Sequence, residues 1–288
     1  MKRSLRRVGA ALTTLVLSAS MLSACGFSGG GDLLTSIEEG KVIIGTKYDQ
    51  PGLGLRQVDG SMSGLDVDVA TYVVEAIAEN RGLEKPKIEW REAPSSQRET
   101  LIRNGEVAMI AATYSINEGR LNTVNFGGPY LLTNQALLVR EDSDINSLED
   151  LGKRGILCSV TGSTPAQKVK DQMPNIQLQE YDTYSSCAEA LRQGNIDAMT
   201  TDATILNGYS QQDPGQFRLV EMLIDGKPFT NEYYGIGLLK DDTEATDAIN
   251  EALEQMYADG SFNKFVLDNL GSLQGIAETE PGDLSFIS

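Results

Sequence analysis

Two hydroxyl side chains and one guanidinium follow a stretch that reads as a buried strand. Residues 107–112 are almost wholly apolar, and Thr113, Ser115 and Arg120 come shortly after them. A guanidinium donates two parallel hydrogen bonds to a planar carboxylate, and hydroxyl groups add further donors. This combination at the end of a buried strand predicts a site for a small carboxylate, such as that of a free amino acid. The alternative for Arg120 is a surface salt bridge with Glu118.

An internal repeat places a carboxyl group at an equivalent position. Residues 101–113 (LIRNGEVAMIAAT) and 190–202 (ALRQGNIDAMTTD) share a helix end, an Arg-Asn/Gln-Gly stop and an apolar strand. Eight residues after the glycine stands Thr113 in the first copy and Asp202 in the second. Ligands of open α/β sheets bind beyond the carboxyl ends of strands, so two facing lobes place both residues across one cleft. The alternative is a chance match.

The turn VTGSTP, residues 160–165, predicts a second group of anion-binding donors. Its proline suits the first turn of a helix, whose free N–H groups then face the turn. Ser163 and Thr164 add hydroxyl groups, unless they only cap the helix. Asp202 ends a strand that is otherwise apolar or threonine, where a buried carboxylate needs a positive partner. Its alternative role is the N-cap of a helix over 203–210.

Strand-like and helix-like segments alternate along the chain, which predicts an α/β fold. About 260 residues follow the N-terminal leader, enough for two packed lobes. The expected strands cover 41–47, 87–93, 107–113, 136–142, 155–160, 196–202, 217–222 and 233–240. The expected helices cover 64–80, about 95–105, a segment from 165, 184–193, 243–259 and 261–270. The acidic tail, 273–288, contains Gly and Pro and is expected to be disordered.

The N-terminus predicts export. Four basic residues precede an apolar stretch over 8–21, which is too short to span a bilayer comfortably. The sequence LSAC, residues 22–25, resembles the lipobox of bacterial lipoproteins. That resemblance implies a signal peptide over 1–24, a diacylglyceryl and palmitate anchor on Cys25, and attachment to the cell membrane. The alternative is an ordinary secretory signal. Residues 25–35, rich in Gly and Ser, are expected to form a flexible tether.

The remaining cysteines and the absent histidines narrow the chemistry. With Cys25 lipidated, Cys158 and Cys187 remain, and export favours a disulfide between them over two buried free thiols. The chain has no histidine, which excludes Ser-His-Asp triads and histidine-based metal sites. Paired cysteines also disfavour a thiolate zinc site. We expect no metal, no cofactor and no enzyme.

The charge balance excludes two classes of partner. The chain has 24 basic and 41 acidic residues, a net charge of −17. Residues 1–24 hold four of the basic residues and none of the acidic ones, so the mature chain carries −21. A surface this acidic argues against nucleic acid and against electrostatic docking on anionic lipid.

Five segments together resemble family 3 of the extracellular solute-binding proteins, the amino-acid receptors of ABC importers. They are IIGTKYDQP, GLDVDVA, SINEGRLNTVNFGGPY, VTGSTP and DAMTTD. The resemblance implies a two-lobed type II periplasmic-binding-protein fold with a ligand cleft between the lobes and two hinge strands. Lobe 1 would cover 36–133 plus 236–272 and lobe 2 would cover 137–232. The resemblance further implies a monomer whose lobes close on the ligand and dock on an ABC permease.

The resemblance also gives each candidate residue a role. Arg120 would pair with the ligand α-carboxylate, with Thr113 and Ser115 bonding the carboxylate or the ammonium. Ser163 and Thr164 would close on the carboxylate from lobe 2. Asp202 would pair with the α-ammonium.

Two further bases indicate an acidic ligand. Lys47 and Arg98 match positions that are basic in the glutamate/aspartate branch, which this chain resembles most. With Arg120 they give three positive charges against one for Asp202, which suits glutamate or aspartate. A neutral ligand would leave buried cations unpaired. The alternatives are that Lys47 and Arg98 are solvated, or that the chain is a receptor for glutamine or another polar amino acid, a sensor ectodomain, or an exported dehydratase on the same scaffold.

Overall fold

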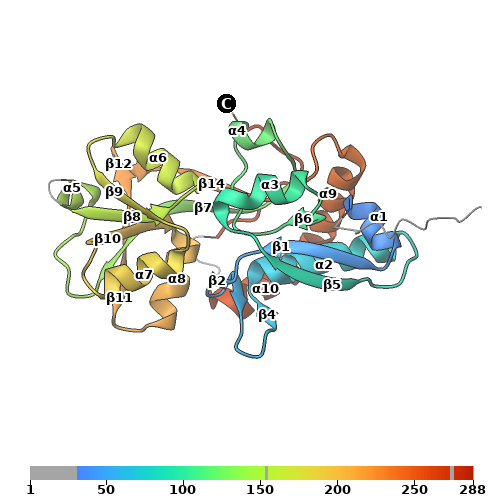
Figure 1. Ribbon diagram of the computed structural model, residues 1–288, viewed down its shortest axis with the longest axis horizontal. Helices are drawn as coiled ribbons and strands as arrows, with labels where there is room; N and C mark the ends of the chain where they lie inside the picture. The colour runs from blue at the N-terminus through green and yellow to red at the C-terminus, as the bar shows by residue number, and fades with distance from the viewer. Residues whose placement is uncertain (1–30, 153–154, 273–275, 288) are drawn as a thin grey trace, which may run out of the picture.

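The computed structural model describes residues 31–152, 155–272 and 276–287, and shows two lobes side by side (Figure 1). Two long strands, β7 (Asn125–Arg140) and β14 (Asn231–Leu238), join the lobes. The predicted signal peptide and Cys25 lie outside the described residues. The predicted tether extends too far, because helix α1 (Leu33–Glu38) begins within it, with Asp32 accepting a hydrogen bond from the Thr35 amide.

The strands of the main sheet follow the order β5-β1-β6-β14-β7-β10-β8-β9, with β11 beside β7, and their remaining bounds are given by lobe below. Strands β2, β3 and β4 form a second sheet, and β12 and β13 form a third. Lobe 1 contains α1, β1 (Lys41–Thr46), β2 (Asp49–Gln50), β3 (Gly54–Arg56), β4 (Met62–Ser63), α2 (Leu65–Asn80), β5 (Lys87–Glu92), η1 (Ser95–Gln97), α3 (Arg98–Arg103), β6 (Met109–Ile110), α4 (Glu118–Leu121), α9 (Thr243–Ala258) and α10 (Ser261–Leu270). Lobe 2 contains α5 (Leu148–Leu151), β8 (Ile156–Val160), α6 (Thr164–Gln172), β9 (Gln177–Tyr181), α7 (Tyr184–Arg192), β10 (Ala198–Asp202), α8 (Ala203–Gln212), β11 (Phe217–Glu221), β12 (Leu223–Ile224) and β13 (Lys227–Pro228).

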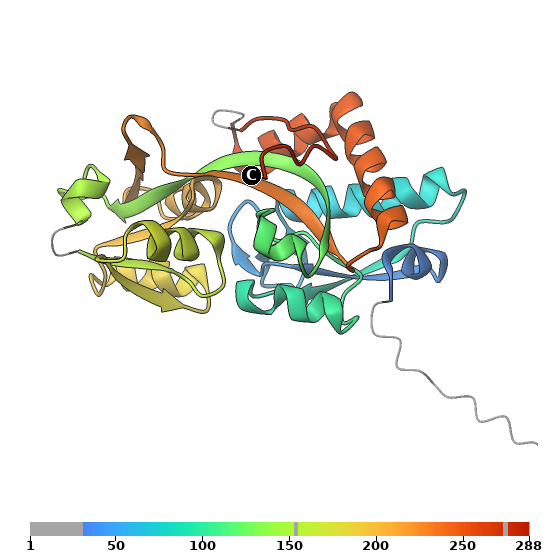
Figure 2. The same cartoon turned by 90° about the horizontal axis from the view of Figure 1, so that it is seen from above.

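The chain passes between the lobes along β7. Up to Asn134 this strand pairs with β14, and from Gln135 onward it pairs with β10 on the other side. The sequence places this crossing near 133–137. Figure 2 shows β7 and β14 arching together over both lobes, so a bend in this pair of strands changes the angle between the lobes.

The internal repeat corresponds to the same local structure in each lobe. Helices α3 and α7 both end two residues before a glycine in the left-handed region, Gly105 at φ 62° and Gly194 at φ 75°. In both, the residue after the glycine donates its amide back into the last turn, Glu106 to the Leu101 carbonyl and Asn195 to the Ala190 carbonyl. In each lobe, this helix ending directs the following segment into a strand under the cleft.

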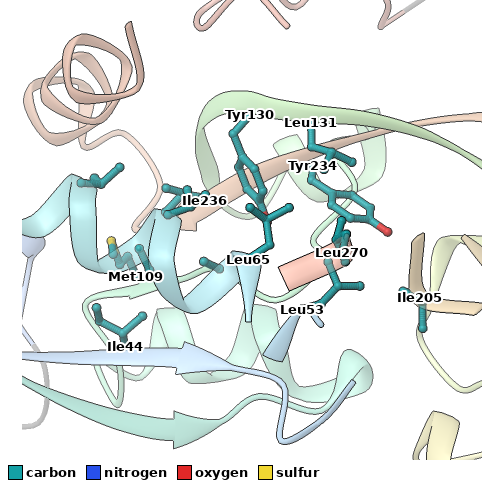
Figure 3. Close-up of a cluster of buried hydrophobic side chains, with 14 of the residues drawn as sticks. Ile44, Leu53, Leu65, Met109, Tyr130, Leu131, Ile205, Tyr234, Ile236 and Leu270 are labelled. Carbon is teal, nitrogen blue, oxygen red and sulfur yellow. The ribbon is translucent and has the colours of Figure 1, made fainter. Parts of the chain in front are cut away.

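A hydrophobic cluster supports the hinge strands from below. Figure 3 shows Tyr130 of β7 and Tyr234 of β14 descending from the hinge onto Leu65 and Leu53. Both tyrosines are fully buried, with ring centroids 6.2 Å apart. The cluster fixes where the two strands leave lobe 1, and therefore where their polar atoms lie relative to the cleft.

The predicted disulfide is confirmed. Cys158 of β8 is bonded to Cys187 of α7, with their Cα atoms 5.8 Å apart and a sequence separation of 29. Closing a loop of that length stabilises the fold by about 3–4 kcal/mol in the chain-entropy model. The bond ties α7 to the strand that leads into the turn at Ser163.

The prediction of a disordered tail is wrong for residues 276–287, which pack on lobe 1. The Thr279 hydroxyl donates to the Pro129 carbonyl at 2.7 Å, and the Gly282 amide donates to the Gly128 carbonyl at 2.9 Å. The Phe286 ring stacks on Tyr233 of β14, with centroids 3.7 Å apart. Charge and Pro/Gly content suggested disorder, but hydrogen bonds to β7 and one aromatic stack hold the segment. Residues 273–275 and 288 lie outside the described residues.

We expect Phe286→Ala to destabilise the protein by about 2 kcal/mol, because it removes both buried apolar area and an aromatic stack. In a chain of this size that loss lowers the melting temperature by about 4–8 °C. Glu280→Ala, an exposed position in the same segment, is the matched control for thermal unfolding. Equal melting temperatures for the two variants would contradict a packed tail.

Candidate functional site

All eight residues proposed from the sequence for ligand binding are at most 9% exposed. They come from six places: the residue after β1, helix α3, the segment after β6, helix α4, the N-cap and start of α6, and the end of β10. Burial of so many polar groups in one place needs compensating partners. The alternative that Lys47 and Arg98 are solvated is therefore wrong.

Arg120 of α4 lies at the contact between the lobes. Its Nη1 donates to the Ser115 carbonyl at 2.6 Å in lobe 1, and its Nη2 donates to the Gly162 carbonyl at 3.1 Å in lobe 2. Its Nε lies 3.3 Å from a carboxylate oxygen of Glu99. The ion pair is thus with Glu99 and not with Glu118, as the alternative supposed. The guanidinium therefore bridges the two lobes, with Nη1 bonded within lobe 1 and Nη2 bonded to lobe 2.

The lobes are in contact on the other side of the cleft as well. The Tyr209 hydroxyl of α8 donates to the Asp49 carbonyl at 2.5 Å, and the Ser185 amide of α7 donates to the Asp49 carboxylate at 3.1 Å. A Cβ atom on Gly208 would lie 2.1 Å from the Pro51 carbonyl oxygen, so glycine permits this approach. In this structure the two lobes are therefore closed on one another.

Thr113 has an uncommon backbone conformation, with φ at 45°. Its amide donates to Asp66 Oδ2 at 2.7 Å, and the Tyr130 hydroxyl donates to Asp66 Oδ1 at the same distance. Thr113 Oγ1 donates to Gln50 Oε1 at 3.2 Å. Burial raises the pKa of Asp66 to about 6, against the lowering effect of these hydrogen bonds. A non-glycine residue persists in this region only when its surroundings hold it there, and Asp66 supplies that restraint.

Lys47 and Arg98 form a buried group of cations with Arg120. Lys47 Nζ donates to Ser95 Oγ at 2.8 Å, and Arg98 Nη1 donates to the Ala112 carbonyl at 3.1 Å. Burial, followed by the positive charge of Arg98, lowers the pKa of Lys47 to about 7. Burial and the charge of Arg120 lower the pKa of Arg98 to about 10. The three cations repel one another, so an anionic ligand among them is electrostatically favoured.

The lobe 2 turn combines a helix cap with the closed cleft. Ser163 Oγ accepts a hydrogen bond from the Ala166 amide at 3.1 Å, so the capping role is present. Asn117 of lobe 1 donates to Thr164 Oγ1 at 3.4 Å across the cleft. The start of α6 therefore lies against the same lobe 1 residues that surround Arg120.

Asp202 lies at the other end of this region and is fully buried. It precedes α8, yet its side chain makes no cap hydrogen bond, so the capping alternative is not supported. Its Oδ2 accepts a hydrogen bond of 2.6 Å from the Tyr234 hydroxyl, while Oδ1 has no partner among the described residues. Burial, and after it the charge of Glu232, raise the pKa of Asp202 well above its usual value. A cationic group beside Asp202 would relieve both effects.

Sequence reasoning missed several residues around these. Tyr114 lies between two cations, with its ring centroid 4.2 Å from the Arg98 guanidinium and 4.8 Å from that of Arg120. Asp66 stands in the segment GLDVDVA, but nothing in that segment indicated its contact with the distant Thr113 amide. Glu99 directly follows Arg98 on α3, and its ion pair with Arg120 depends on tertiary packing that a local pattern does not show.

A groove of about 450 Å³ leads to Arg120 between α4 and α6. Its lining includes Asn117, Arg120, Gly162 and Thr164. No cluster of side chains suited to a metal ion is found in the part of the chain that the structure describes. Within that same part, no helix is both long and apolar enough to cross a membrane.

Comparison with known proteins decides the family. The sequence model of bacterial extracellular solute-binding proteins, family 3, matches residues 42–271. The chain belongs to this family. The glutamate-binding protein GluB of Corynebacterium efficiens is 70% identical over 289 residues, covering 99% of this chain and 98% of that protein. The glutamine-binding protein GlnH of Bacillus subtilis is 33% identical over 85% of this chain and 90% of its own length.

A solved structure agrees with this assignment. An ancestral arginine-binding protein bound to glutamine superimposes with a TM-score of 0.70 at 31% identity, covering 81% of this chain and 99% of the other. The predicted two-lobed α/β fold is therefore confirmed. Family 3 consists of extracellular solute-binding proteins, so this receptor acts outside the cytoplasm, and the dehydratase alternative loses its support.

Proposed function

We propose that this family 3 receptor binds glutamate and releases it to the permease of an ABC importer when the lobes reopen. One observation carries the proposal: Lys47, Arg98 and Arg120 are buried together at the contact between the lobes, with the unpaired Oδ1 of Asp202 nearby. Glutamate offers two carboxylates to the cations and one ammonium to the acid. The name of the relative that is 70% identical supports the same ligand.

In this proposal the two ends of the ligand have separate partners. Arg120, Ser163 and Thr164 receive the α-carboxylate, and Thr113, Ser115 and Asp202 surround the α-ammonium. Lys47 and Arg98 face the side-chain carboxylate. Aspartate carries the same charges on a side chain shorter by one methylene. We expect it to bind more weakly, because its side-chain carboxylate lies farther from Lys47 and Arg98.

A glutamine receptor is the second candidate. It is favoured by the relative GlnH, named for glutamine, at 33% identity. Glutamine would leave one buried cation without a counter-charge, which costs several kcal/mol unless that cation loses its proton. Lys47 can do so, since burial lowers its pKa to about 7. The comparison of glutamate with glutamine is therefore the informative measurement.

Calorimetric titration of the chain beginning after Cys25, stripped of bound ligand by unfolding and refolding, tests the proposal. We expect micromolar or tighter binding of glutamate, weaker binding of aspartate, and glutamine weaker by about 100-fold, since an unpaired buried charge costs about 3 kcal/mol. Asparagine and arginine complete the panel. Tight glutamine binding would favour the second candidate, and binding of no amino acid would refute the receptor proposal.

The proposed anchor is a lipid on Cys25, which would hold a monomeric receptor at the cell membrane beside its permease. The lipobox-like LSAC supports it. Cys25→Ala is expected to move the protein from the membrane fraction into the medium without changing its affinity for glutamate. Retention of the variant in the membrane fraction would contradict the anchor.

A further inference from the structure

The hinge strand β14 carries a buried carboxyl group that has no role in the site described so far. Glu232 is 2% exposed, and its Oε1 has no hydrogen-bond partner among the described residues. Nor does any lysine or arginine in that part of the chain form an ion pair with it. The nearby hydroxyl groups of Ser115 and Thr230 lower the pKa of Glu232 against the effect of burial, but neither carries a charge. A buried carboxylate without a counter-charge is costly, so Glu232 is suited to a cationic group that the protein itself does not supply.

The strand places Glu232 on the side of the hinge that faces the site. Residues two apart on a strand point to the same face, so Glu232 shares its face with Tyr234. Figure 3 shows the Tyr234 hydroxyl pointing out of the lobe 1 cluster toward Ile205 of lobe 2. That hydroxyl donates to Asp202 at 2.6 Å, and Ser115 forms an isolated bridge with Tyr234.

Two carboxyl groups with unsatisfied oxygens flank β7 at this point, where Glu232 pairs with Thr133 on one side of the strand and Asp202 pairs with Gln135 on the other. Asp202 Oδ1 and Glu232 Oε1 are both buried and both unpartnered among the described residues. Asp202 comes from β10 of lobe 2, and Glu232 comes from the hinge strand β14. Their charges affect each other, and the charge of Glu232 is the largest influence on the pKa of Asp202 after burial. An ammonium group, with three donors, satisfies two carboxylates and a hydroxyl together.

We propose that Glu232 is a second acceptor for the α-ammonium group of the bound amino acid, which it holds together with Asp202. The inference rests on the proposed function, because it requires a ligand with an ammonium group. It also makes the hinge a direct part of the binding site, so that occupancy favours one geometry of β14. Burial raises the pKa of Glu232, and the charge of Lys168 of α6 acts against this rise, so Lys168 is the competing cationic partner.

Glu232→Gln tests the proposal, because it keeps the shape of the side chain and removes its charge. Titrations compare glutamate with glutarate, which has the same two carboxylates and no amino group. We expect glutamate to bind about 10- to 100-fold more weakly, the loss for one charge-assisted hydrogen bond, and glutarate to bind equally or more tightly. The unliganded variant should melt at the same or a higher temperature, since an unpaired buried charge has gone. Glu221→Gln, at an exposed position on β11, is the matched control.

Each other outcome overturns the inference. Unchanged glutamate affinity in Glu232→Gln shows that the side chain does not touch the ligand. Weaker binding with a lower melting temperature, or with glutarate weakened to the same extent, shows a structural role. An equal loss of glutamate affinity in Lys168→Met assigns Glu232 to that lysine. If the unmodified protein binds no amino acid, the proposed function fails instead, so the two failures are distinguishable.

Discussion

Replacing Arg120 with alanine is expected to weaken the binding of every amino acid by about 10²- to 10⁴-fold, because one partner of a buried charge pair is lost. Both terminal nitrogens of this guanidinium lie at the contact between the lobes, bonded to the Ser115 and Gly162 carbonyls. In the proposed complex, the α-carboxylate would accept the remaining N–H group of each of these nitrogens. The effect should be the same for glutamate, aspartate and glutamine, which share the α-carboxylate. Calorimetric titration of the three ligands measures it.

Two control variants separate ligand binding from folding. Arg120→Ala leaves Glu99 without its ion-pair partner, so the double variant with Glu99→Gln removes that unpaired charge. Arg120→Lys keeps the charge but not the two-pronged geometry, and we expect a partial loss. Arg103→Ala alters an exposed arginine of α3 and should leave affinity unchanged. Loss of less than about 10-fold in both Arg120→Ala forms would refute the role of Arg120.

The repeat and the apolar strands predicted where Thr113 and Asp202 lie in the fold, because both patterns depend on local backbone conformation. An Arg-Asn/Gln-Gly helix end followed by an apolar strand favours a helix C-terminus with glycine in the left-handed region. The structure has this conformation at both Gly105 and Gly194. The polar residues after such strands must then lie near the sheet edge. Thr113 and Asp202 were predictable for this reason, without knowledge of their partners.

The surroundings of these residues were not predictable, because they depend on contacts between distant segments. The sequence-based count of three cations against Asp202 omitted Asp66, Glu99 and Glu232, all acids that tertiary packing brings near the site. The tail shows the same limit. Its acidic composition indicated disorder, but the stack of Phe286 on Tyr233 joins positions 53 residues apart, and a local pattern does not contain such a contact.

Raising the pH from about 6.5 to about 8.5 is expected to weaken glutamate binding, by up to about 10-fold per pH unit, through loss of the proton on Lys47. Burial and the neighbouring arginines lower the pKa of this lysine to about 7 in the unliganded protein. A carboxylate bound beside it raises that pKa again, so binding takes up a proton and is favoured at lower pH. Lys47→Arg keeps its charge over this range and should not show this weakening as the pH rises. Lys47→Met should show weak glutamate binding at every pH.

Other groups titrate in the same site, and their effect on affinity as the pH rises is opposite to that of Lys47. The raised pKa values of Asp202 and Glu232 mean that both acids become more fully charged as pH rises, which strengthens their attraction for an ammonium group. That effect acts equally on glutamate and glutamine, since both carry the α-ammonium. The ratio of the two dissociation constants therefore cancels it and isolates Lys47. We expect the preference for glutamate to decline as pH rises in the wild type and to stay constant in Lys47→Met. A preference that declines equally in both proteins would mean that the side-chain carboxylate lies near a different group.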